Sequence, residues 1–163
     1  MDHSDNALAA AMKALEEVVA PALDPADPQA AEQLVLVIDS LRFLRERLDH
    51  LHDRARFDLR HHLALARAIS DDAPLDAEIA AATAVYERAD ARTPELRESA
   101  AELAAALRTV VRDTTDDVTR RRIERRILEG SRERIQADRA WHLPQGFDPD
   151  PGAVAPLELA LEP

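Results

Sequence analysis

The feature that most constrains the fold is a long stretch without helix breakers. Residues 29–69 contain neither glycine nor proline. Apolar residues recur there close to a heptad, the spacing of one face of a long helix. We therefore expect one continuous helix from Gln29 to Ile69, on the order of 60 Å long at about 1.5 Å per residue. Its apolar series comprises Leu34, Val37, Ile38, Leu41, Leu44, Leu48, Leu51, Ala55, Leu59, Ala66 and Ile69.

A second apolar stripe runs along the same predicted helix at a spacing of seven residues. The helix is therefore expected to contact neighbours on two sides, either at the centre of its own bundle or at a self-association face. Exposed Phe43 and Phe57 would form a costly apolar patch on a monomer. We predict a homodimer with Leu36, Phe43 and Phe57 at the contact. The stripe comprises Leu36, Phe43, His50, Phe57 and Ala64.

The remainder of the chain also favours helices. Only 3% of the residues are aromatic and only three are glycine, a composition that favours helix over sheet. Ser4 or Asp5 can cap a first helix that ends at Pro21, and Thr93 can cap another with Pro94 in its first turn. A further helix should follow Pro74. We predict an all-α, elongated bundle of four to five helices around the long central helix.

The sequence leaves the end of one helix undecided and gives no clear helical pattern after Arg139. Residues 113–117 hold capping residues but no helix breaker, so the helix from Pro94 either ends there or continues to Arg139. After Arg139 the helical pattern fails, and residues 156–162 alternate like a short strand. We predict a helical bundle domain of residues 1–140 and an extended, proline-containing tail of residues 141–163 that docks on the bundle.

One cluster on the long helix could hold a metal ion. Asp49, His52 and Asp53 share one face and would need further ligands from another helix, such as Asp113, Asp116 or Asp117. A metal-dependent hydrolase with this site is an alternative function. We favour a structural role in which the acids form salt bridges with arginines three or four residues away. Neither a metal nor a cofactor is expected.

A second cluster, Arg-rich, lies between residues 120 and 139. It has eight arginines and four acids, an excess that makes nucleic-acid binding through the last helix another alternative. The spacing instead predicts a solvated face with the pairs Arg120–Glu124, Arg125–Glu129 and Glu129–Arg132. No aromatic residues are interleaved for base stacking. Nucleic acid is therefore not an expected partner.

The expected function follows mainly from exclusions. The chain has a net charge of −11 and no cysteine, and it lacks the glycine-rich phosphate loop and the catalytic signatures of common hydrolases. Its first residues show no signal peptide and no segment is apolar enough to span a bilayer, so we expect a cytoplasmic protein. We predict a non-catalytic, self-associating interaction module that serves an enzyme or regulatory complex. An apolar-ligand pocket between helices is a further alternative.

Overall fold

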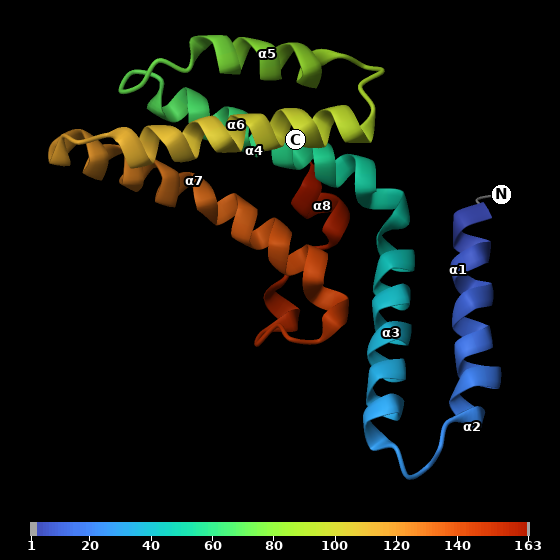
Figure 1. Ribbon diagram of the computed structural model, residues 1–163. Coiled ribbons are helices and arrows are strands. Elements are labelled where there is room, and N and C mark those ends of the chain that lie inside the picture. Colours follow the sequence, from blue (N-terminus) through green and yellow to red (C-terminus); the bar gives the residue numbers. More distant parts are fainter. Residues whose placement is uncertain (1–2, 163) are drawn as a thin grey trace. The chain divides into compact units, whose positions relative to one another are not determined.

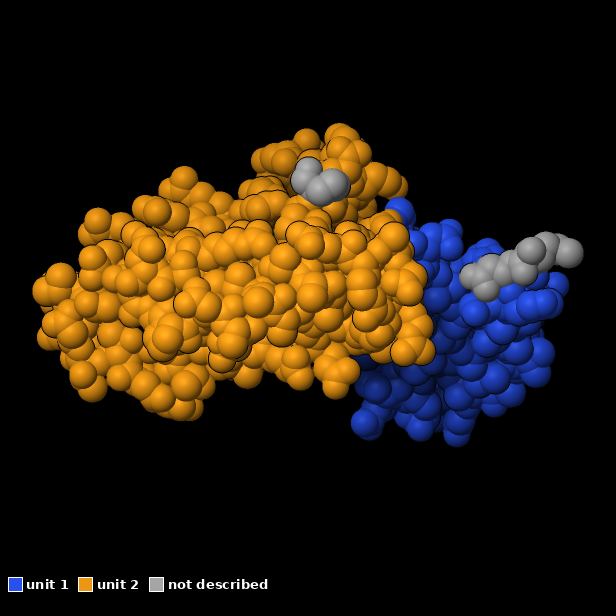
Figure 2. Space-filling model, turned by 90° about the horizontal axis from the view of Figure 1, so that it is seen from above, with its two compact units in different colours: residues 1–50, 142–148 blue, residues 51–141, 149–163 orange. Residues whose placement is uncertain are grey.

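The computed structural model describes residues 3–162, and this part of the chain forms helices and no strand (Figure 1). The predicted all-α fold is confirmed. Contacts divide the chain into two compact units, which Figure 2 colours separately. Unit 1 comprises residues 1–50 and 142–148, and unit 2 comprises residues 51–141 and 149–163. This division does not test the predicted boundary between a helical bundle domain of residues 1–140 and a tail of residues 141–163, which stays a prediction.

Unit 1 is built on a helical hairpin. Its arms are α1 (His3–Ala14) and α3 (Pro28–Arg47), which lie side by side in Figure 1. The Asp27 carboxylate caps α3 by accepting the Ala30 N–H at 3.0 Å, and Pro28, whose missing N–H costs nothing there, occupies the first helical position. Asp5, expected as a cap of the first helix, lies inside α1. Its carboxylate accepts a hydrogen bond from Arg45 Nε of α3 at 2.5 Å, which joins the two arms.

The first helix passes Pro21 before it ends. A π-helical turn, Leu15–Val19, follows α1 and leads into the short α2 (Ala20–Ala22). Proline lacks an N–H and its ring clashes with a carbonyl one turn earlier. The wider π turn relaxes this clash, so the helical path continues one residue beyond the predicted stop.

The predicted long helix is present, with one local change of helix type. Helical residues run without a gap from Pro28 to Ile69, as α3, a single 3-10 turn (Leu48–His50) and α4 (Leu51–Ile69). No glycine or proline marks the turn in the sequence. It coincides with the point at which the chain passes from unit 1 to unit 2.

In unit 2, α4 is packed against α5 (Asp76–Glu87) and α6 (Thr93–Asp113), which also pack against each other (Figure 1). Apolar side chains from all three helices form the main core, together with Ile123 of the following helix. The most deeply buried members are Ala55, Leu59, Leu63, Ala66, Ile69, Leu75, Ala82, Leu96, Leu103 and Ile123. None of the described helices is both long and apolar enough to cross a membrane.

The start of α6 differs in detail from the prediction. Thr93 is its first residue and not its cap, since Arg92 precedes it in an extended conformation. The Glu95 carboxylate accepts the Arg92 N–H at 2.9 Å, so a side chain inside the first turn satisfies the helix end. The Thr93 hydroxyl is thereby left for a contact with α4.

The helix from Thr93 does not continue to Arg139. It ends at Asp113, and α7 (Asp117–His142) begins after three non-helical residues. Asp116 caps α7 by accepting the Thr119 N–H at 2.8 Å. Hydrogen bonds from the Thr119 side chain and from its backbone N–H lower the pKa of Asp116, which favours the charged cap at the positive end of the helix. The capping residues therefore outweigh the absence of a breaker.

Residues 156–162 do not form the predicted short strand. They contain the helix α8 (Leu157–Leu161), preceded by a 3-10 turn at Pro151–Ala153. Leu157 and Leu161 lie four residues apart and pack against Phe57 of α4 and Ala137 of α7. Leu159 stays 59% exposed. Alternating leucines fit a strand, but their docking on α4 and α7 selects the helical spacing.

Candidate functional site

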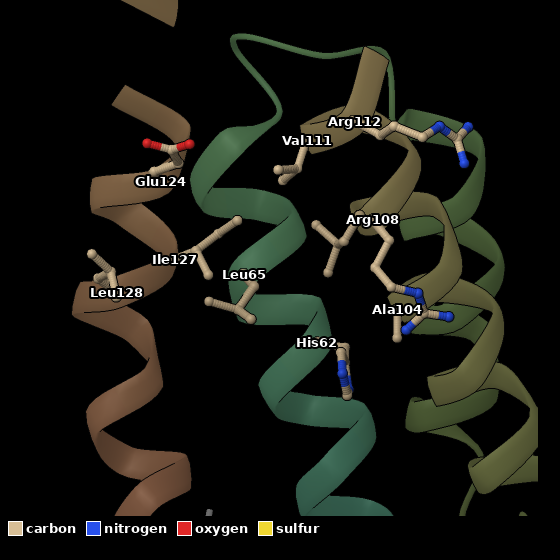
Figure 3. Close-up of a pocket in the computed structure, with 10 residues that line it drawn as sticks. His62, Leu65, Ala104, Arg108, Val111, Arg112, Glu124, Ile127 and Leu128 are labelled. Carbon is tan, nitrogen blue, oxygen red and sulfur yellow. The ribbon is translucent and has the colours of Figure 1, made fainter. Parts of the chain in front are cut away.

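An apolar groove in unit 2 could hold a ligand. It lies between α4, α6 and α7 and has a volume of about 620 Å³, within the range of small-molecule sites. Leu65 and Leu107 are buried at its base, while Leu128 is 71% exposed at its edge. Figure 3 shows the lining side chains, which come from these three helices. The lining residues are His62, Leu65, Ala104, Leu107, Arg108, Val111, Arg112, Glu124, Ile127 and Leu128.

The polar groups of the groove are unevenly placed. Arg108 extends along α6 toward Ala104 and the end of the groove that holds His62, whereas Arg112 points away (Figure 3). Arg112 forms an ion pair with Asp113, with Nε and Oδ1 2.7 Å apart. Arg108 is exposed and has neither a hydrogen bond nor an ion pair with any residue between 3 and 162. Glu124 lies on the wall formed by α7.

His62 supplies a neutral polar atom to this end of the groove. Its Nδ1 is 2.7 Å from the Asp58 carbonyl oxygen. A carbonyl can only accept, so Nδ1 carries the hydrogen and the neutral ring leaves Nε2 as an acceptor. Burial lowers the pKa of His62, and the charges of Arg134 and Arg108 act in the same direction. The imidazole is therefore held in its neutral form.

Beside the groove, a charge cluster of four residues joins α4 to α7. Asp58 lies 3.2 Å from Arg54 Nη2 and 3.4 Å from Arg134 Nη1. Asp138 forms ion pairs with the same two arginines. The Arg54 guanidinium also stacks over Trp141 at 5.5 Å from the ring centre. Each carboxylate is thus held between two cations, an arrangement that stabilises helix packing and leaves no free base.

The three predicted interface residues lie in different surroundings. Leu36 of α3 is 52% exposed. Phe43 is partly buried and stacks on His142, with ring centres 5.8 Å apart. Phe57 is only 1% exposed and packs against Ala137 and Leu161 in unit 2. Phe57 therefore belongs to the core of its own chain and cannot form a surface contact.

The predicted metal ligands are not brought into a site. No group of three or more histidine, aspartate or glutamate side chains within residues 3–162 is arranged to hold a metal ion. Asp49 lies in the 3-10 turn, whereas His52 and Asp53 begin α4. His52 Nδ1 instead lies 3.1 Å from the Thr93 hydroxyl. Further along the same helix, Asp58 forms an i,i+4 salt bridge with Arg54.

The Arg-rich helix forms ion pairs, but not the predicted ones. Arg120 pairs with Asp117, and Arg122 pairs with Asp72 at 2.9 Å. The expected pairs Arg120–Glu124, Arg125–Glu129 and Glu129–Arg132 are not formed in the described structure. Asp117 and Asp72 thus hold Arg120 and Arg122 in place of the predicted partners. On α7, Arg121, Arg125 and Arg132 are exposed and form no ion pair with residues 3–162.

The groove was not predicted from the sequence. The signal that could have found the groove is the adjacent pair Ile127 and Leu128 within an otherwise charged helix. Two neighbouring apolar residues point about 100° apart on a helix, so this pair makes the apolar side of a charged helix wide.

Comparison of the chain with protein-family models, with curated proteins and with solved structures finds no match. A function can therefore be inferred only from the groove, the exposed surfaces and the distribution of charge.

Proposed function

We propose that this chain is a non-catalytic, cytoplasmic interaction module that self-associates through one side of α3. The observation that carries the proposal is the small core of unit 1. Among its described apolar side chains only Met12 and Ile38 are buried. A two-helix hairpin with so little buried apolar area has little to stabilise it. A second hairpin packed on α3 would supply the missing contacts.

The exposed apolar residues of α3 define the side on which a second copy would pack. Leu36, Val37 and Leu44 are 52%, 48% and 41% exposed. At about 100° per residue they fall within a single arc of about 100° on the helix. We name these three residues the α3 face. Two hairpins that are related by a two-fold axis and pack through this face would form a four-helix bundle. Each residue of the α3 face would then be buried in both copies.

The charge of unit 1 sets a condition on this association. Its 57 positions hold eleven acidic and four basic residues, a net charge of −7. Two such units repel each other, and added salt screens the repulsion. The dimer is therefore expected to strengthen as the ionic strength rises, in contrast to an association held by opposite charges.

Light scattering coupled to size-exclusion chromatography tests the proposal. The wild type should have twice the chain mass of 18.1 kDa, and a Leu36→Glu and Leu44→Glu double variant should be a monomer of unchanged helicity. Val35→Glu is the matched control, since Val35 is 55% exposed but lies about 180° around the helix from Leu44. A monomeric wild type at high salt, or a control variant that dissociates equally, would refute the proposal.

A further inference from the structure

Among residues 3–162, the groove of unit 2 is lined by one cation without an ion pair, Arg108 of α6, and by one such carboxylate, Glu124 of α7 (Figure 3). Arg108 has no ion-pair partner among residues 3–162, while Arg112 is neutralised by Asp113. Arg108 extends toward the end of the groove that holds His62 (Figure 3). The His62 Nδ1 hydrogen is used by the Asp58 carbonyl. An anionic group at this end would meet a cation that no carboxylate of the chain already occupies.

The remainder of the groove offers apolar contact. Leu65, Leu107, Val111, Ile127 and Leu128 line it from three helices. An exposed strip of such residues is costly in water and favours an apolar occupant. An amphipathic helix would require charges spaced along both rims to match its i, i+4 side chains. Along the sides of this groove the charged residues are Glu124 and Arg112, and Arg112 is already paired with Asp113. These charges do not match the regularly spaced charges of an amphipathic helix.

We propose that this groove binds an amphiphile with an unbranched alkyl or acyl chain and a terminal carboxylate. The carboxylate pairs with Arg108, and the chain lies along the apolar strip between α6 and α7. A volume of about 620 Å³ is in the range of sites for ligands of this size. The site lies wholly within unit 2, so the inference is independent of self-association through α3.

Calorimetric titration with dodecanoate below its micellar concentration tests the proposal. One dodecanoate should bind per chain, and each methylene removed, as in decanoate and octanoate, should weaken binding. The expected step is about fourfold per methylene, which is about 0.8 kcal/mol. Dodecanol should bind more weakly than dodecanoate, and a dodecyl trimethylammonium ion should bind most weakly because Arg108 repels it.

Variants locate the two halves of the ligand. Arg108→Leu should abolish the preference for dodecanoate over dodecanol, a loss of about fivefold for a partly exposed ion pair. Arg125→Leu removes the same charge from an exposed arginine outside the groove and should change nothing. Leu128→Glu places a like charge at the groove edge and should remove dodecanoate binding without unfolding, because Leu128 is 71% exposed.

Three results would overturn the proposal. They are the absence of dodecanoate binding to the wild type, equal binding of dodecanoate and dodecanol, and an Arg125→Leu variant that loses the preference as Arg108→Leu does. The last two would show that apolar adsorption or general surface charge accounts for the binding.

Discussion

The helices α3 and α4 share one uninterrupted apolar pattern but differ in how much of it they bury. α3 buries Ile38 and Arg47, whereas α4 buries eight side chains, among them Phe57, Leu59 and Ile69. The difference arises from neighbours, since α4 contacts α5, α6 and α8 and α3 has mainly α1. Apolar periodicity thus shows which side of a helix needs a partner. It does not show whether that partner belongs to the same chain.

The largest effect should come from truncating matched leucines in the two helices. Leu59 of α4 is fully buried and Leu44 of α3 is 41% exposed. Leu59→Ala should lower the free energy of unfolding by about 3 kcal/mol, through lost burial and a cavity. Leu44→Ala should cost less than about 1 kcal/mol in dilute monomer. Urea denaturation measures both. Equal losses would show that α3 is as well packed as α4.

Acid should weaken α4 through a buried histidine. Burial lowers the pKa of His61 to about 4, and the charges of His62 and Arg134 act in the same direction. The unfolded ring takes up a proton near its ordinary pKa of about 6.5. Above that pH, His61 is neutral in both states and does not lower the free energy of unfolding. As the pH falls from about 6.5 to about 4, the unfolded chain binds a proton that the folded chain does not, so the free energy of unfolding falls.

The measurement is urea denaturation at pH 7.5 and pH 4.5, with His61→Gln as the control. Between these values the wild type should lose about 2 kcal/mol more stability than the variant. The variant still contains His62, whose pKa is also lowered, so the difference isolates His61. Parallel losses in both proteins would mean that His61 titrates normally in the folded state.

The smallest change in stability should come from Gly130, where α7 comes close to α4. A Cβ at this position would lie 2.5 Å from Leu65 Cδ2, so alanine requires Leu65 to turn. The gain in helix propensity, about 1 kcal/mol, should roughly offset this shift. Because Leu65 lines the groove, Gly130→Ala should weaken dodecanoate binding with a nearly unchanged urea midpoint.

Gly152→Ala is the control for this variant, since the added Cβ would meet only Asp150, at 3.9 Å. It should leave dodecanoate binding unchanged. If Gly130→Ala binds dodecanoate as tightly as the wild type does, Leu65 turns away from the groove and not into it.

The helical class was predictable because composition and periodicity act locally along the chain. The start of α3 is local in the same way, since Asp27 caps it and Pro28 stands in its first turn. The 3-10 turn at Leu48–His50 was not predictable, since its residues are compatible with an α-helix. Likewise, the leucines of α8 fit two spacings, and only their contact with Phe57 decides between them.

The groove and the interface depend on pairings between distant helices. Phe43 and Phe57 occupy equivalent places in one heptad stripe, yet one stacks on His142 and the other is enclosed by α7 and α8. Arg108 can bind a ligand carboxylate only because no acid of α7 pairs with it, and the sequence of α6 alone does not show this. Such pairings are absent from the periodicity of any single helix. This is why the site residues were harder to predict than the fold.

The allocation of residues 142–148 to unit 1 has a consequence for synthesis. His142, which covers Phe43, is translated about 100 residues later, a delay of about 5 to 20 seconds at typical rates of about 5–20 residues per second. During that interval the hairpin of α1 and α3 has left the ribosome without its covering segment. Nascent chains stalled before His142 should therefore expose more of Phe43 to chaperones or to a neighbouring copy than full-length chains do.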